Sequence, residues 1–152
     1  MVRDNKRGVT FIEMLMVFII VGLVMAMGMP RLHSVVERHA VSTARDQVLS
    51  ALNTARTTAV RRGAMTTFNT SGNDVWVTVD SSGTEVTLVS KISLYGSHNV
   101  TLSVTGNASK IAYNMRGLSS NAAGRLIMTR GAKIDSICVT QLGGATTLAC
   151  PS

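Results

Sequence analysis

The chain has 152 residues, which is enough for one domain plus an appendage. Hydrophobic residues make up 45% of it but aromatic residues only 4%, which argues against a large aromatic core and suits small β-sheets with exposed loops. The formal net charge of +7 permits contact with nucleic acid or anionic lipid without demonstrating either.

The N-terminal segment is predicted to form a membrane-length helix. Residues 14–28 carry no charge, and with the apolar residues just before them they give a helix of about 20 residues and roughly 30 Å, the thickness of the hydrocarbon core of a bilayer. Arg3, Lys6 and Arg7 precede this run as the denser basic cluster. We therefore expect the N-terminus to stay in the cytoplasm and the C-terminal bulk to lie outside.

One acidic residue, Glu13, lies near the start of this apolar run. A carboxylate in a bilayer is costly, by about 2.5–3.5 kcal/mol at its centre and less near the interface. An ordinary secretory signal cut after Gly28 and a simple membrane anchor both fit the apolar run. Neither alternative explains why the carboxylate is there.

The helix is predicted to continue past Pro30, with a kink at the proline, because helical periodicity resumes at once. Its apolar residues recur at spacings of three or four, at Val41, Ala44, Val48, Ala51, Leu52, Ala55 and Ala59. These side chains are small and allow close approach, so docking on a sheet is favoured over a coiled-coil partner. Gly63 is predicted to end the helix as its C′ residue.

After Gly63 the pattern changes to a period of two, which is typical of short strands. We expect strands at residues 64–69, 75–80, 85–90, 100–104, 110–114, 125–130 and 136–141. Turn-forming residues at 70–73, 81–84, 105–109 and 131–133 separate several of them. Val75, Val77 and Val79 are predicted to face the core, with Trp76 on the opposite face. The sequence thus predicts one long helix packed across antiparallel sheet.

The two cysteines, Cys138 and Cys150, lie near the C-terminus. An even number of cysteines in an exported domain predicts one disulfide. It would close a final hairpin turned by Gly143 and Gly144, and a loop of this size is stabilised by about 3 kcal/mol in the chain-entropy model. Two unpaired thiols are the alternative, and a zinc site would need further ligands that are absent nearby.

No constellation of residues suggests catalysis, so we expect no enzymatic activity, no cofactor and no small-molecule substrate. His33, His39 and His98 are scattered along the chain. His33 and Glu37 are spaced i and i+4, but they have no third ligand and no general base beside them. We therefore expect surface residues there and no metal site.

The stretch "RGVTFIEML" at residues 7–15 resembles the class III signal of type IV pilins and pseudopilins. The resemblance implies that a prepilin peptidase cuts after Gly8 and methylates Val9, the new N-terminus, where the family usually has Phe. It further implies that Glu13 pairs with this amine in a neighbouring subunit during assembly. Two charges that are costly alone in lipid become less costly as a pair. Residues 9 and 13 also share a helix face, so pairing within one chain is an alternative.

The stretch from residue 44 to 69 resembles the GspH/FimT branch of that superfamily, whose members often show an "AR…RRG" pattern before the first strand. The resemblance implies a pilin-like α+β fold, in which the membrane-spanning first half of a long N-terminal helix precedes a second half packed on antiparallel β-sheet. The expected organisation is a leader at 1–8, a transmembrane and assembly helix at 9–30 and a periplasmic globular domain at 31–152.

The function implied is that of a minor type IV pilin, a subunit of the pilus or of its initiating tip complex. Other major and minor pilins, the prepilin peptidase and the bacterial inner membrane are the expected partners, before the protein reaches the pilus at the cell surface. The C-terminal cysteine pair favours a pilus component over a type II secretion pseudopilin, which stays an alternative.

Some pilins of this branch bind DNA during uptake, so a DNA-binding minor pilin for natural transformation is the other alternative. In this chain the last ten residues contain no Lys or Arg. The candidate phosphate contacts lie upstream, at Lys110, Arg116, Arg125, Arg130 and Lys133. Binding through such a stripe would depend strongly on salt, whereas a merely solvated basic face would not bind.

Overall fold

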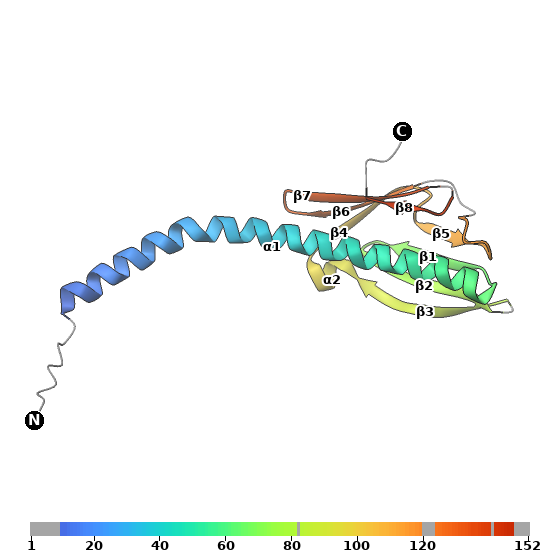
Figure 1. Cartoon of the computed structure of the whole chain (residues 1–152), viewed down its shortest axis with the longest axis horizontal. Coiled ribbons are helices and arrows are strands. Elements are labelled where there is room, and N and C mark those ends of the chain that lie inside the picture. Colours follow the sequence, from blue (N-terminus) through green and yellow to red (C-terminus); the bar gives the residue numbers. More distant parts are fainter. Residues whose placement is uncertain (1–9, 82, 120–123, 141, 148–152) are drawn as a thin grey trace, which may run out of the picture. The chain divides into compact units, whose positions relative to one another are not determined.

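The computed structural model describes residues 10–81, 83–119, 124–140 and 142–147, without the side chains of residues 27–32. The chain divides into two compact units, Met1–Val36 and Glu37–Ser152. Helix α1 (Phe11–Arg62) contributes its first part to the first unit and the rest to the second. Figure 1 shows the eight strands and the short second helix of the second unit.

The first unit contains the beginning of α1. The backbone N–H groups of Glu13 and Met14 donate to the carbonyl oxygen of Thr10, at 3.1 and 3.3 Å, and so close the first turn. Glu13 lies in that turn, where a negative charge is favourable beside the positive end of the helix dipole. The helix continues through Pro30. A kink at this proline stays a prediction.

In the second unit one face of α1 is buried. The stripe predicted from the sequence, from Val41 to Ala59, is almost inaccessible to solvent at every position. The helix ends at Arg62, and Gly63 follows with a φ of +59°, a conformation that glycine adopts without a steric penalty. The prediction of Gly63 as the residue that ends the helix is therefore confirmed.

The first sheet has four antiparallel strands in the order β3-β2-β1-β5. They are β1 (Thr66–Ser71), β2 (Asp74–Ser81), β3 (Thr84–Ser93) and β5 (Lys110–Tyr113). Val75, Val77 and Val79 are buried, and Trp76 lies on the opposite face and is partly exposed, as the alternation predicts. The strand β3 extends three residues beyond the predicted end, and its register against β2 shifts on both sides of Val77.

The sequence pattern did not predict α2 (Leu94–His98). Its cap is local, because the Ser93 hydroxyl accepts a hydrogen bond from the Gly96 N–H, and Asn99 closes the helix in the left-handed region with a φ of 57°. A five-residue helix is too short to show a helical period. Leu94 is fully buried, so packing of this side chain into the core holds the short helix in place.

The second sheet also has four antiparallel strands, in the order β4-β6-β7-β8. They are β4 (Thr101–Gly106), β6 (Gly124–Arg130), β7 (Lys133–Val139) and β8 (Ala145–Thr146). The final hairpin is present: the Thr140 N–H donates to the Gly144 carbonyl at 2.9 Å, and Gly143 has a φ of +78°. β7 begins at Lys133, which the sequence pattern assigned to the preceding turn.

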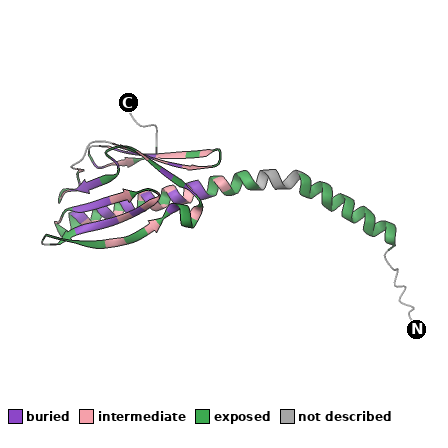
Figure 2. Cartoon of the chain, turned by 180° about the vertical axis from the view of Figure 1, so that it is seen from behind, coloured by how far each residue is buried: buried purple, intermediate pink, exposed green. Residues whose placement is uncertain are grey.

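The α+β fold is confirmed, with one refinement: the helix packs on two sheets that share a single core. The core cluster joins the buried stripe of α1 to Phe68 and Val77 of the first sheet and to Leu126 and Met128 of the second. Figure 2 shows the buried residues of this unit along the helix and on the strands that face it. The strand β4 pairs with β6 and not with β5, which follows it in the chain, and this crossover separates the two sheets.

Candidate assembly helix and basic residues

The first part of α1 is apolar on every side and exposed on every side. All its described side chains from Phe11 to Ala26 are exposed, and the large apolar ones range from 41% exposed at Val21 to 84% at Phe11. A helix that is hydrophobic all round is stable only when lipid or other protein covers it. This segment is therefore built to be covered from outside the chain.

Glu13 is the one acidic residue of this segment, and its side chain is exposed. Gly8 and Val9, the predicted cleavage and methylation residues, lie outside the described residues, so pairing of Glu13 with the Val9 amine stays a prediction. Among the residues that the structure describes, no helix is both long enough and apolar enough to span a bilayer.

The five basic residues predicted to contact DNA are distributed over both sheets. Lys110 begins β5 and Arg116 lies in the turn after it, whereas the other three belong to the β6–β7 hairpin. Arg130 and Lys133 are register partners beside its turn. Arg125 is five positions from Arg130 in one strand, so their side chains leave opposite faces of the sheet. The fold thus brings Arg130 and Lys133 together and separates Arg125 from both.

Arg130 is also committed to a structural contact. Its guanidinium donates a hydrogen bond of 2.6 Å to the backbone carbonyl of His98, at the end of α2. This contact joins the second sheet to the short helix. Arg130 is therefore partly buried, which makes it less available to a phosphate than a fully exposed arginine would be.

A basic cluster that the sequence analysis did not single out lies where α1 ends. A Cβ built on Gly117 would lie 3.4 Å from two atoms of Arg56 and 2.9 Å from Val60 Cγ2, so the turn after β5 rests on the last turns of the helix. Arg116 directly precedes this glycine in the chain, and Arg61 and Arg62 follow Arg56 in the final helical turn. The spacing of the arginines within residues 56–62 could have identified the helical part of this cluster. It could not have shown that the turn after β5 packs against it.

Two charged contacts fasten the helix to the second sheet. The guanidinium of Arg45 lies 3.0 Å from Asp46 and 3.1 Å from Asp135 of β7. The hydrogen bond that Arg45 donates to Asp46 is the main cause that raises the pKa of Arg45. Glu37 lies against the β6–β7 turn, because a Cβ on Gly131 would come within 2.5 Å of its carboxylate. In the first sheet, burial raises the pKa of Tyr113, the last residue of β5.

Cys138 is buried in β7, where it faces Thr146 of β8 in register. Cys150 lies outside the described residues, so the Cys138–Cys150 disulfide stays a prediction. In the described part of the chain no three His, Cys, Asp or Glu side chains gather in a way that could hold a metal ion.

Comparison with known families gives two matches. The model of the family described as Type II transport protein GspH matches residues 44–143, which is most of the second unit. The prokaryotic N-terminal methylation motif matches residues 3–29. A search of curated proteins finds no match to the sequence.

Among solved structures, the fold is similar to two crystal forms of the type IV minor pilin FimU of Pseudomonas aeruginosa PAO1. The P21 form aligns with a TM-score of 0.59 at 16% identity and covers 74% of this chain and 91% of that one. The P65 form aligns with a TM-score of 0.54 at 15% identity and covers 69% and 90%. At such identities the likeness shows a shared fold.

Proposed function

The chain belongs to the GspH family of pilins and pseudopilins, which are structural proteins without enzymatic activity, and from that premise we propose that it is a minor type IV pilin. It would be a subunit of the pilus or of the initiating complex at its tip. Membership of the family implies processing at the N-terminal methylation motif and assembly with other pilins. The prepilin peptidase would cut after Gly8 and methylate Val9.

The observation that carries this proposal is the exposed apolar start of α1 with a single carboxylate in its first turn. Residues 9–30 would hold the protein in the inner membrane, with residues 31–152 in the periplasm. In the fibre the same segment would be covered by the corresponding helices of other pilins. Glu13 would then meet the Val9 amine of a neighbour, because leaving either charge unpaired in an apolar bundle is costly.

The similarity to a type IV minor pilin and the predicted disulfide support a pilus component. A type II secretion pseudopilin is the alternative, in keeping with the description of the matching family. The deletion phenotype separates the two. Loss of twitching motility or transformation with normal protein secretion supports the pilus, and loss of secretion alone supports the pseudopilin.

A DNA-binding minor pilin is the other candidate. The observation that favours it is the presence of four arginines, at 56, 61, 62 and 116, in the last turns of α1 and in the turn that packs on them, in addition to the Arg130–Lys133 pair. The test is a mobility shift with the full-length protein in detergent at several salt concentrations. Contact with several phosphates predicts an affinity that falls steeply with salt. The absence of a shift at low salt would exclude this function.

The central experiment replaces Glu13 by Ala and by Gln. Both variants should be cleaved before Val9 and should reach the membrane. Fibre incorporation should fall roughly a hundredfold, because removing one partner of a buried ion pair costs about 3 kcal/mol and each 1.4 kcal/mol is about a factor of ten. Glu85→Ala is the matched control, since Glu85 is an exposed glutamate on the edge strand β3. Sequencing of the mature N-terminus and quantitation of the protein in sheared pili are the measurements. Wild-type incorporation of Glu13→Ala would refute the proposal.

A further inference from the structure

The end of the globular unit at which α1 finishes exposes a group of large apolar side chains. Its members are Val60, Met65, Met115, Leu118 and Leu142, which are 54%, 48%, 64%, 38% and 73% exposed. We call these five residues the end patch. They come from the helix, from the loop before β1, from the loop after β5 and from the last hairpin, so they are dispersed in the sequence.

Close packing brings together the turns that carry the end patch. The Gly117 turn rests on Val60, because a Cβ there would lie 2.9 Å from Val60 Cγ2. The last hairpin rests in turn on that loop, because a Cβ on Gly143 would lie 2.9 Å from the Gly117 carbonyl oxygen and 3.1 Å from the Ser119 nitrogen. Leu118 and Leu142 are therefore carried on neighbouring turns, next to Val60.

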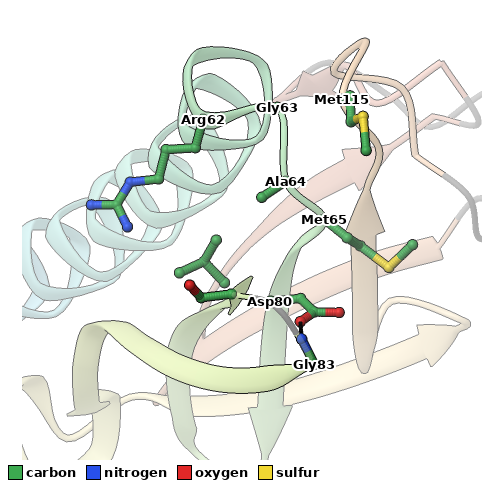
Figure 3. Close-up of a pocket in the computed structure, with 9 residues that line it drawn as sticks. Arg62, Gly63, Ala64, Met65, Asp80, Gly83 and Met115 are labelled. Atoms are coloured by element: carbon green, nitrogen blue, oxygen red, sulfur yellow. Dashed lines mark hydrogen bonds between the residues drawn. The ribbon is translucent and has the colours of Figure 1, made fainter.

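The remaining two members, Met65 and Met115, line a shallow groove of about 680 Å³ between the end of α1 and the β2–β3 turn. Figure 3 shows Arg62 and Gly63 on the helical side, Asp80 and Gly83 on the other side, and both methionine side chains at the same end of the groove. Unbranched methionine side chains adapt to irregular surfaces, which suits them to binding another protein.

The charge around the end patch is mainly positive. Arg62 lines the groove and Arg56 lies against the Gly117 turn. Arg61 stands beside Arg62 in the last turn of α1, and Arg116 directly precedes Gly117 in the chain. Asp80 contributes a carboxylate to the lining of the groove. This carboxylate accepts a hydrogen bond of 2.9 Å from the Gly83 N–H, so it stabilises the β2–β3 turn. An apolar centre with an arginine rim is typical of a protein interface and complements a surface with carboxylates at its edge.

We propose that the end patch binds a different protein, whose surface presents apolar side chains flanked by Asp and Glu. A second copy of this chain would bring two arginine rims together, and like charges across an interface are unfavourable. A concave groove also fits protruding side chains better than a flat lipid surface. The inference uses the proposed function only for the compartment in which the partner is met, because the contacts themselves belong to the globular unit.

The test places a photo-crosslinking phenylalanine derivative at Met115 in the full-length chain, in cells that produce it at its natural level. Ile134 is the matched control, because it is 70% exposed in β7 and is not part of the end patch. We expect a crosslink from position 115 to another protein, at a peptide that contains or adjoins Asp or Glu, and none to that protein from position 134. A crosslink to a second copy, to lipid or to no protein would overturn the proposal.

Charge reversal gives a second, independent readout. Arg116→Glu should lower the crosslink yield at position 115 by about fivefold, since opposed rim charges mainly set the rate of association. Arg125→Glu, a reversal at an exposed arginine in β6, should leave the yield unchanged. Equal yields in both variants would overturn the assignment of an acidic partner.

Fibre incorporation of the Glu13 variants, measured in the same cells, tests the proposed function separately from the crosslink. If Glu13 variants lose fibre incorporation and the crosslink at position 115 is absent, the pilin function stands and the end patch inference fails. If Glu13 variants are incorporated normally and the crosslink is present, the end patch inference stands and the proposed function fails.

Discussion

Gly124, the first residue of β6, touches the loop that carries the chain from the second sheet to the first. A Cβ built on Gly124 would lie 2.5 Å from Ala108 Cβ, 2.6 Å from the Ala108 nitrogen and 3.0 Å from its Cα. Ala108 is itself fully buried in the core cluster. Gly124→Ala therefore forces main-chain atoms apart at the point where the two sheets meet.

Overpacking of a core costs about 1–3 kcal/mol, and the upper end is expected because the obstructing atoms are backbone. A loss of about 3 kcal/mol would lower the melting temperature by roughly 12 °C for a unit of this size. Gly72→Ala is the control. Gly72 has a φ of +59° with no atom within 4 Å of its Cβ position, so this variant should lose only about 1 kcal/mol from backbone strain.

The assay is urea unfolding of the full-length protein in detergent, followed by fluorescence of Trp76, the single tryptophan of the chain. Ala108→Gly in the Gly124→Ala background removes the contact with the Ala108 Cβ but leaves the contact with its nitrogen, so recovery should be partial. If Gly124→Ala is no less stable than Gly72→Ala, the close approach between β6 and this loop is wrong.

Two further outcomes are expected in the same assay. Burial raises the pKa of Tyr113, so its contribution to stability is complete below the ordinary pKa near 10 and is lost as the pH rises through the folded-state pKa. Tyr113→Phe should therefore show a smaller loss of stability between about pH 9 and 11 than the wild type, and parallel curves would contradict this reasoning. Ala55→Leu should cost about 1–3 kcal/mol because Ala55 is fully buried between helix and sheets. Asn53→Leu, at an exposed position of the same helix, should change stability by less than about 0.5 kcal/mol, and equal effects of the two would contradict the docking of this face.

The local features of the fold were predictable because each depends on residues that lie close together in the sequence. The spacing of Val41, Val48 and Leu52 identified the buried helix face, and the alternation at residues 75–79 identified the buried strand face. Gly63 and the Gly143–Gly144 turn were predictable for a similar reason, since a left-handed conformation favours glycine. The short α2 and the long β3 were missed, because a capped five-residue helix and a strand with register shifts show no regular period.

In the candidate site, too, some residues could be identified from the sequence and others could not. The apolar segment and Glu13 could be identified from neighbouring residues alone. The basic residues could not be grouped from the sequence, because residues 125 and 130 share a strand but leave opposite faces. The turn that contains Arg116 approaches Arg56 only in the folded chain, at Gly117.

By itself the sequence determined that one long helix begins apolar, with a single carboxylate near its start, and that short strands follow it. Only the tertiary structure decided that these strands pair as two sheets, and that Val60, Met115 and Leu142 come to one end of the unit. The reason is physical: periodicity records which face of an element is buried, but the partner of that face is chosen by packing between segments far apart in the chain.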